Sequence, residues 1–380
     1  CKKYYILLSI LPKSQYYNYI LLQRVRIQLN YDFWRVSNMN MYKWVDKLIY
    51  EEDKKAFPLL SFPSVQLLYV TVKELVTDSN YQALGMKMLA DKYPMPAVAS
   101  FMDLSVEAEA FGASTVYSAD EVPTIIGKIV ETEEEADALR VPEIGEGRTG
   151  IYVEGVRKAL KLITDRPVFA GCTGPFSLAG RLMDVNEVML QCYEEPELVH
   201  KILRKATDFL IEYINAYKAV GAHGIIMAEP LAGVLSPQLI QEFSTEYVKE
   251  IVEATQEQGF IIIYHNCGNY TIQLIDQILD TGCRVFHFGD AIDMRAMMEL
   301  MPPDCVAMGN ISPSQQFRNG TPQSVRIETV RLLENCKEYR NFVISSGCDI
   351  PPLTEFENID AFFETVDSFY YKQRLLDIIM

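Results

Sequence analysis

From residue 95 onward, short apolar runs alternate with longer stretches of helical periodicity. Five of the runs stand out in the C-terminal half, at residues 224–227, 260–264, 284–288, 305–308 and 342–344. Helical patterns fill the gaps between them, for example over residues 196–220 and 237–258. Alternation of this kind is typical of βαβ units, so the chain is predicted to have an α/β fold with a parallel sheet covered by helices.

Each of the five runs leads into polar residues whose side chains are suited to catalysis or ligand binding. In chain order these are Glu229, His265 with Cys267, Asp290, Asn310 and Cys348. Parallel strands present their functional groups at their carboxyl ends, so five strands that deliver such residues to one rim predict a (β/α)8 TIM barrel. An open doubly wound sheet is the alternative, because it also gathers ligands at strand ends. The chain has no glycine-rich dinucleotide fingerprint.

The combination of His265, Cys267 and Cys348 offers one imidazole and two thiolates to a metal ion. Residues i and i+2 of an extended segment point the same way, so His265 and Cys267 can converge on one ion. Structural zinc sites usually have four protein ligands, whereas catalytic sites have three and leave one position open. We therefore predict a catalytic zinc site. The other internal cysteines are expected to be small buried apolar residues, namely Cys172, Cys192, Cys283, Cys305 and Cys336.

Composition narrows the possible partners and compartments. The 380 residues are 49% hydrophobic and carry a formal net charge of −16, with a pI near 4.8. This charge argues against binding to nucleic acid or to an anionic membrane surface. No apolar stretch approaches the length of a membrane span, so no membrane association is expected. Eight cysteines without a signal peptide of the usual form favour reduced thiols and a cytoplasmic location.

The first 38 residues differ in charge from the rest of the chain. They hold six of the 35 basic residues but one of the 51 acidic residues, and the first methionine is Met39. We expect residues 1–38 to be a basic N-terminal extension and residues 39–380 to form the TIM-barrel catalytic domain. The competing interpretation is a basic, aromatic-rich helix that packs on the barrel or on a partner.

Several segments resemble the uroporphyrinogen decarboxylase superfamily, and within it the methylcobamide:coenzyme M methyltransferases. The segments are Phe57-Pro58-Leu59-Leu60 with Phe62-Pro63, the run from Met102-Asp103-Leu104-Ser105 to Gly112, Gly174-Pro175-Phe176-Ser177-Leu178-Ala179, and Met308-Gly309-Asn310-Ile311-Ser312-Pro313. The resemblance implies a TIM barrel. The zinc motif of the methyltransferase branch, His-x-Cys with a later Gly-Cys, falls on His265, Cys267 and Cys348.

The resemblance implies a zinc-dependent enzyme that moves a methyl group from a methylated corrinoid, carried by a partner protein, to a small thiol such as coenzyme M. The Arg-Gln-Ala-Gly-Arg type of motif that grips the tetrapyrrole carboxylates in the decarboxylases is absent. Without those guanidinium groups an octa-anionic substrate loses its bidentate clamps. A decarboxylase and a non-enzymatic zinc-stabilised binding protein are the alternatives.

Four further residues are candidates for the site. Glu229 is the candidate catalytic residue, as a fourth zinc ligand, a proton acceptor or a partner of His265; otherwise it caps the next helix. Asp103, Asp290 and Asn310 are candidates for binding the substrate or for supporting the metal ligands.

Overall fold

A single parallel sheet organises the chain in the computed structural model, which describes residues 39–52 and 54–379. Its strands are β1 (Val98–Ala99), β4 (Val168–Thr173), β5 (Gly224–Ala228), β6 (Ile261–Asn266), β7 (Val285–Phe288), β8 (Val306–Ile311) and β9 (Phe342–Ser346). They are hydrogen bonded in the order β1-β4-β5-β6-β7-β8-β9, with all pairs parallel. The spatial order follows the chain order without a reversal, which excludes the doubly wound alternative.

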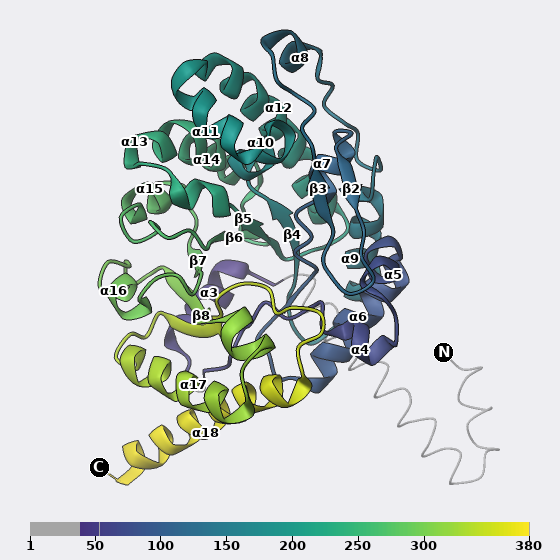
Figure 1. Ribbon diagram of the computed structural model, residues 1–380. Helices are drawn as coiled ribbons and strands as arrows, with labels where there is room; N and C mark the ends of the chain where they lie inside the picture. Colours follow the sequence, from purple (N-terminus) through teal and green to yellow (C-terminus); the bar gives the residue numbers. More distant parts are fainter. Residues whose placement is uncertain (1–38, 53, 380) are drawn as a thin grey trace, which may run out of the picture.

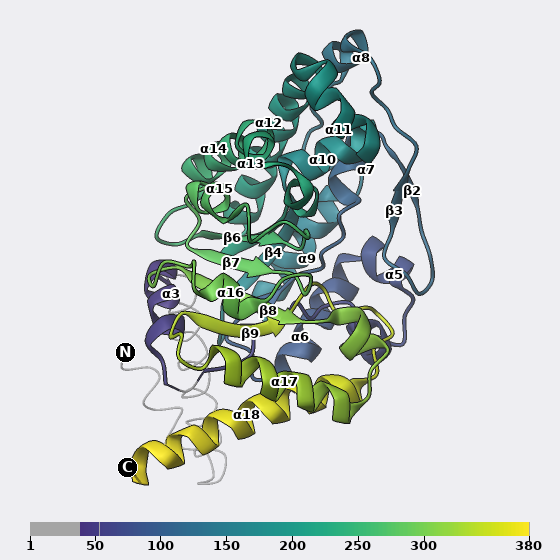
Figure 2. The same ribbon diagram turned by 60° about the vertical axis from the view of Figure 1, so that its left-hand side comes forward.

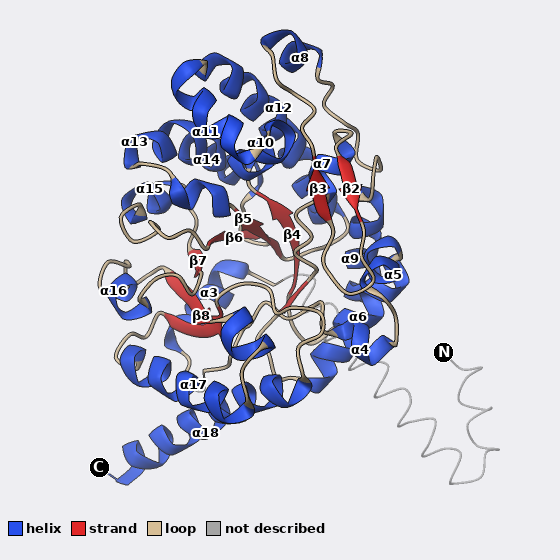
Figure 3. Ribbon diagram, viewed as in Figure 1, coloured by secondary structure: helices blue, strands red, loops and turns tan. Residues whose placement is uncertain are grey.

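Helices connect the strands and surround the sheet (Figure 1 and Figure 3). They are α3 (Met41–Tyr50), α4 (Ser64–Leu68), α5 (Val72–Thr77), α6 (Ser79–Lys92), α7 (Val106–Ala110), α8 (Glu133–Ala138), α9 (Thr149–Leu162), α10 (Pro175–Met183), α11 (Val185–Glu194), α12 (Pro196–Ala219), α13 (Pro237–Ile240), α14 (Glu246–Thr255), α15 (Ile275–Asp280), α16 (Met294–Met298), α17 (Pro322–Cys336) and α18 (Phe356–Ile379). The described elements also include a 3-10 helix, η1 (Pro230–Val234), two π-helices, η2 (Gln241–Thr245) and η3 (Pro313–Arg318), and the hairpin of β2 (Ser114–Val116) and β3 (Thr124–Ile126).

Side chains of the strands alternate between two apolar cores. One core holds every second residue of the sheet together with α3, including Trp44, Phe169, Ile226, Ile263 and Val343. The intervening strand residues pack in the second core with the surrounding helices. The sheet therefore curls around an inner core, and α3 lies at the end where the strands begin (Figure 2).

Closure into eight strands is not confirmed, because the sheet has seven strands among the described residues. The segment at residues 56–60 lies beside β9, where the Phe57 amide donates to the Ile344 carbonyl at 3.0 Å and the Leu59 amide donates to Ser346 Oγ at 3.0 Å. Pro58 follows Phe57 and has no N–H for a ladder. The structure is thus a curled α/β half-barrel with an irregular edge segment where a closed barrel would have another strand.

The sequence patterns agree with these elements closely. All five strands predicted in the C-terminal half are present, each within two residues of the predicted start. The predicted helix at residues 196–220 is α12, whereas the pattern at 237–258 is broken by the π-helical turn η2 between α13 and α14. Within the described ranges, no helix combines the length and the apolar character needed to cross a membrane. The prediction for residues 1–38 lies outside those ranges.

Candidate metal centre

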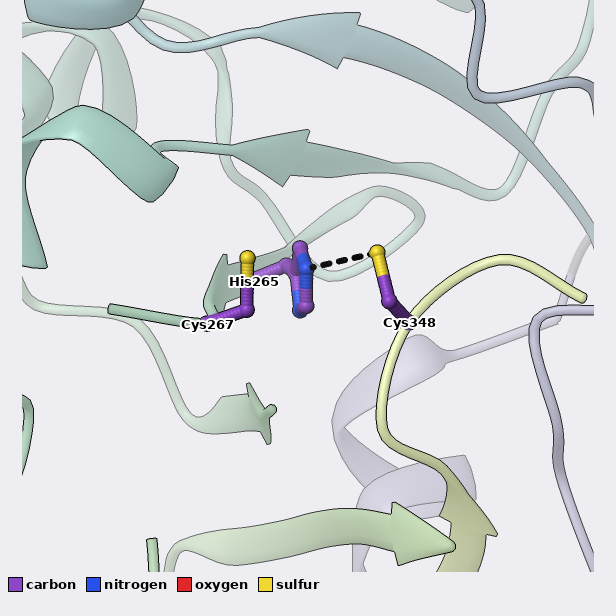
Figure 4. A group of neighbouring side chains, drawn as sticks. All are labelled: His265, Cys267 and Cys348. Carbon is purple, nitrogen blue, oxygen red and sulfur yellow. Dashed lines mark hydrogen bonds between the residues drawn. The ribbon is translucent and has the colours of Figure 1, made fainter. Parts of the chain in front are cut away.

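His265, Cys267 and Cys348 meet at the carboxyl ends of β6 and β9 (Figure 4). One potential ligand atom from each lies within 4.8 Å of the other two. Cys348 Sγ is 3.6 Å from His265 Nε2. The His265 side chain is buried and the two cysteines are half-buried. The structure thus brings together the three residues that were predicted as metal ligands, although Cys348 lies 81 positions after Cys267 in the chain.

The separation of Cys348 Sγ and His265 Nε2 fits two ligands of one zinc ion. With a Zn–S distance of about 2.3 Å and a Zn–N distance of about 2.0–2.1 Å, a tetrahedral angle places sulfur and nitrogen about 3.6 Å apart. Cys348 Sγ and His265 Nε2 have that spacing. Among the described residues, no other His, Cys, Asp or Glu belongs to this cluster. Three donors of this type would leave one position of a tetrahedral ion open, as in catalytic sites.

The turn after β6 fixes the position of Cys267. Asn266 Oδ1 accepts hydrogen bonds from the Gly268 amide and from Thr271 Oγ1, both at 2.9 Å. Gly289, just after β7, packs so closely on Cys267 that an added Cβ would lie 2.6 Å from Cys267 Cα. Glycine at position 289 is therefore required for the thiol to occupy this place.

The two thiols influence each other's acidity. A hydrogen bond from Cys348 lowers the pKa of Cys267. The same hydrogen bond, together with burial, raises the pKa of Cys348 to about 12. Of the two thiols, Cys267 is therefore the one that loses its proton more readily.

His287, which the sequence patterns did not single out, lies directly behind His265. The two residues are Cα partners across β6 and β7, and their Nδ1 atoms are 2.8 Å apart. His287 Nε2 lies 2.8 Å from Ser345 Oγ, and the Ser345 hydroxyl donates to the Phe57 carbonyl at 2.7 Å. Burial lowers the pKa of His287 well below its usual range, so the ring is neutral. The sequence signal that could have identified His287 is its polar side chain within the apolar run 284–288.

Glu229 follows β5 and is fully buried. Its carboxylate accepts hydrogen bonds from the Phe176 amide at 2.7 Å, the Ser177 amide at 3.2 Å and Ser244 Oγ at 3.2 Å. Burial raises the pKa of Glu229 to about 7, although the two amides oppose this shift. The side chain thus caps the amino end of α10, and it is not among the clustered ligand atoms.

Asp103 belongs to a separate buried network. It accepts from Tyr152 Oη at 2.7 Å and from Ser105 Oγ at 2.6 Å, and it pairs with the buried guanidinium of Arg148. Arg148 also pairs with Glu109. These partners give Asp103 a structural role in joining the start of α7 to α9. A contact between Asp103 and a substrate stays a prediction.

Asp290 and Asn310 line one small cleft of about 210 Å³ beside α16 and α17. The Asn310 amide donates to the carbonyls of Gly289 at 3.0 Å and Ile292 at 2.9 Å, so it holds the loop that follows β7. Asp290 is close enough to Cys267 for its charge to oppose ionisation of that thiol. Asn310 therefore supports the loop against which Cys267 packs, and Asp290 belongs to that loop. A role of either residue in substrate binding stays a prediction.

Glu107 is a further buried carboxyl, which sequence reasoning missed. One oxygen accepts from the Thr173 amide at 3.0 Å, whereas Oε2 has no hydrogen-bond partner in the described structure. Burial raises the pKa of Glu107 to about 7. Only the fold reveals this environment, because the residue sits in an ordinary-looking helical segment.

All seven cysteines in the described part of the chain are free thiols. The expected burial holds for Cys172, Cys192, Cys283 and Cys336, whereas Cys305 is half-buried. Burial raises the pKa of Cys283 and of Cys336 to about 12, as expected for inert core thiols.

Comparison with known proteins identifies the family. The family model described as "Uroporphyrinogen decarboxylase (URO-D)" matches residues 65–369. The chain belongs to this family. Its relatives in the URO-D family include uroporphyrinogen decarboxylase of Coxiella burnetii (strain Dugway 5J108-111), which is 24% identical over 319 residues, covering 80% of this chain and 84% of the relative.

A second relative is methylcobamide:CoM methyltransferase MtbA of Methanosarcina acetivorans, 26% identical over 279 residues, covering 71% of this chain and 78% of the relative. Among solved structures, a methyltransferase from Methanosarcina mazei aligns with a TM-score of 0.76 at 21% identity, covering 88% of this chain and 100% of that chain. The structural match supports the fold, and the sequence matches place the chain near both decarboxylases and methyltransferases. The family resemblance noted from the motifs is confirmed.

Proposed function

We propose that this protein is a zinc-dependent methyltransferase that moves a methyl group from a methylated corrinoid, carried by a partner protein, to a small thiol such as coenzyme M. The observation that carries the proposal is the cluster of His265, Cys267 and Cys348, whose spacing and donor types suit zinc with one open position. The similarity to methylcobamide:CoM methyltransferase MtbA supports the same proposed function.

Zinc in this site would supply a Lewis acid that lowers the pKa of a thiol substrate and so provides thiolate at neutral pH. His265, Cys267 and Cys348 would hold the ion. Two thiolate ligands would offset its charge, which keeps a substrate sulfur nucleophilic. Cys267 is prepared for this task because its pKa is already lowered by Cys348.

Glu229 is the candidate acceptor for the proton that the thiol releases. Its backbone is adjacent to the metal cluster, since the Glu229 amide donates to the His265 carbonyl at 2.8 Å. A carboxyl group whose pKa is about 7 exchanges protons readily at neutral pH. Its hydrogen bonds with the amino end of α10 hold it in one place. We propose this role in preference to zinc ligation, because Glu229 lies outside the ligand cluster.

The partner and compartment follow from the same proposal. A corrinoid carrier protein would dock over the carboxyl ends of the strands, where the cluster lies. The acidic net charge of −16 favours a protein or small-molecule partner over nucleic acid. Seven free cysteines are consistent with a reducing compartment such as the cytoplasm.

Methyl transfer is tested with methylcobalamin as the donor and a panel of small thiols, coenzyme M first. Demethylation should require both zinc and thiol, and it should be lost in the Cys348→Ala variant. Thiol binding to the zinc-loaded protein should release a proton that an indicator dye detects. Zinc-loaded protein that neither releases protons nor demethylates the donor with any thiol would reject the proposal.

Decarboxylation is the second candidate function, because several relatives are named uroporphyrinogen decarboxylase. That reaction would use neither the metal cluster nor a thiol. A purely structural zinc is the third alternative. It would predict full saturation by protein ligands, whereas three residues gather in the described structure.

A further inference from the structure

A buried chain of polar side chains runs behind the metal cluster from β6 across β7 to β9. His265 and His287 lie side by side on paired strands, with their Nδ1 atoms 2.8 Å apart. His287 Nε2 lies 2.8 Å from Ser345 Oγ. His287 and Ser345 are completely buried, and His265 is 2% exposed. The two rings and the Ser345 hydroxyl therefore do not exchange their hydrogen bonds freely with water.

The hydrogens along this chain can be assigned from its far end. The Ser345 hydroxyl donates its single hydrogen to the Phe57 carbonyl at 2.7 Å. Ser345 Oγ can then only accept, so His287 carries its hydrogen on Nε2. A neutral imidazole has one N–H, which leaves a lone pair on His287 Nδ1. His265 must then donate from Nδ1, and its own lone pair is on Nε2, which faces Cys348 Sγ at 3.6 Å.

We infer that His287 and Ser345 are positioning residues that select the His265 tautomer able to bind the metal. Histidine ligands usually donate their other ring N–H to a carboxylate, a backbone carbonyl or water. Here a second imidazole accepts it at 2.8 Å, while the backbone carbonyl of His287 is a longer alternative at 3.2 Å. The inference rests on the metal-binding part of the proposed function and not on methyl transfer.

Removing the His287 ring should weaken the metal site without removing a ligand. His287→Leu leaves His265 with the longer carbonyl acceptor, so the zinc dissociation constant should rise by about tenfold, the lower end of the range for such supporting residues. His287→Gln should restore most of the affinity, because its amide oxygen can accept from His265 and its N–H₂ can donate to Ser345. His223→Leu is the matched control, since His223 is also a buried histidine, but it lies at the start of β5.

Nitrogen NMR reads the tautomers directly. The chain has four histidines, so ¹⁵N-histidine labelling yields a spectrum simple enough to assign with one variant per ring. In the reduced, metal-free full-length protein, His265 should be protonated on Nδ1 and His287 on Nε2. Ser345→Ala removes the hydroxyl acceptor for His287 and leaves the Ser346 backbone as its remaining partner, so the share of the opposite tautomer should rise in both rings. This second variant keeps the test decisive if His287→Leu does not fold.

Zinc affinity is measured in parallel by competition with a chelator. The inference is overturned if His265 in the wild-type protein is protonated on Nε2, or if His287→Leu and His223→Leu bind zinc equally well. Failure of His287→Gln to recover affinity would also contradict tautomer selection and indicate that the ring serves only packing. A protein with the expected tautomers and zinc affinities but no methyl transfer would retain this inference and reject the proposed function.

Discussion

Replacing Gly289 with alanine tests whether the fold holds Cys267 in a metal-binding position. The added Cβ would lie 2.6 Å from Cys267 Cα, roughly 0.8 Å inside ordinary van der Waals contact. The loop carrying Cys267 must move to relieve this overlap, because the neighbour is backbone rather than the end of a flexible side chain. Metal–ligand distances tolerate deviations of about 0.2 Å, so a shift of this size is several times too large.

We therefore expect Gly289→Ala to weaken zinc binding by about tenfold or more and to cost about 1–3 kcal/mol of stability. Zinc affinity is measured by chelator competition and stability by urea unfolding. Gly259→Ala is the matched control, because an added Cβ there meets nothing within 4 Å. That variant should keep full zinc affinity. The reasoning is wrong if Gly289→Ala binds zinc within twofold of the wild type.

Four further predictions address other parts of the structure. The Cys267→Ala, Cys348→Ala double variant should stay folded but bind no stoichiometric zinc in metal analysis, and retained zinc would reject the site. Glu229→Gln should slow methyl transfer with little change in zinc affinity; unchanged kinetics would leave Glu229 with only its helix-capping role. The pKa of Glu107 is raised from 4.5 to about 7, so the folded state keeps this proton longer than the unfolded state does. The protonated Glu107 carboxyl therefore contributes its full stabilisation below pH 4.5. About 3 kcal/mol of stability is lost as the pH rises through about 7. Glu107→Gln should flatten this part of the pH–stability curve. Deleting residues 1–38 should leave zinc content and activity nearly unchanged, whereas an inactive or insoluble product would show that the basic segment packs on the domain or recruits a partner.

Local spacing was sufficient to predict that His265, Cys267 and Cys348 would lie together. His265 and Cys267 share one side of an extended segment, and Cys348 follows another strand, so the parallel sheet brings them to one edge. The apolar runs likewise predicted five strands of the sheet. These features depend on short-range periodicity, which is visible in the sequence.

Longer-range packing determined what the sequence patterns missed. The contact of His287 with His265 depends on the register between β6 and β7. The burial of Asp103 depends on its ion pair with Arg148, which lies 45 residues away in the chain. Neither pairing has a local signature. The described residues also lack the expected eighth strand. At its place, the edge segment next to β9 contains Pro58 and departs from regular pairing.

The most direct test of the central claim offers one zinc-loaded preparation two substrates in parallel. One reaction contains methylcobalamin and coenzyme M and is followed by cobalamin absorbance; the other contains uroporphyrinogen and is followed by the number of carboxyl groups on the porphyrin. We predict thiol-dependent demethylation of methylcobalamin that disappears when Cys267 or Cys348 is replaced by alanine, with no change in the porphyrin. Loss of carboxyl groups from uroporphyrinogen without any thiol, and no demethylation with any thiol in the panel, would contradict the account.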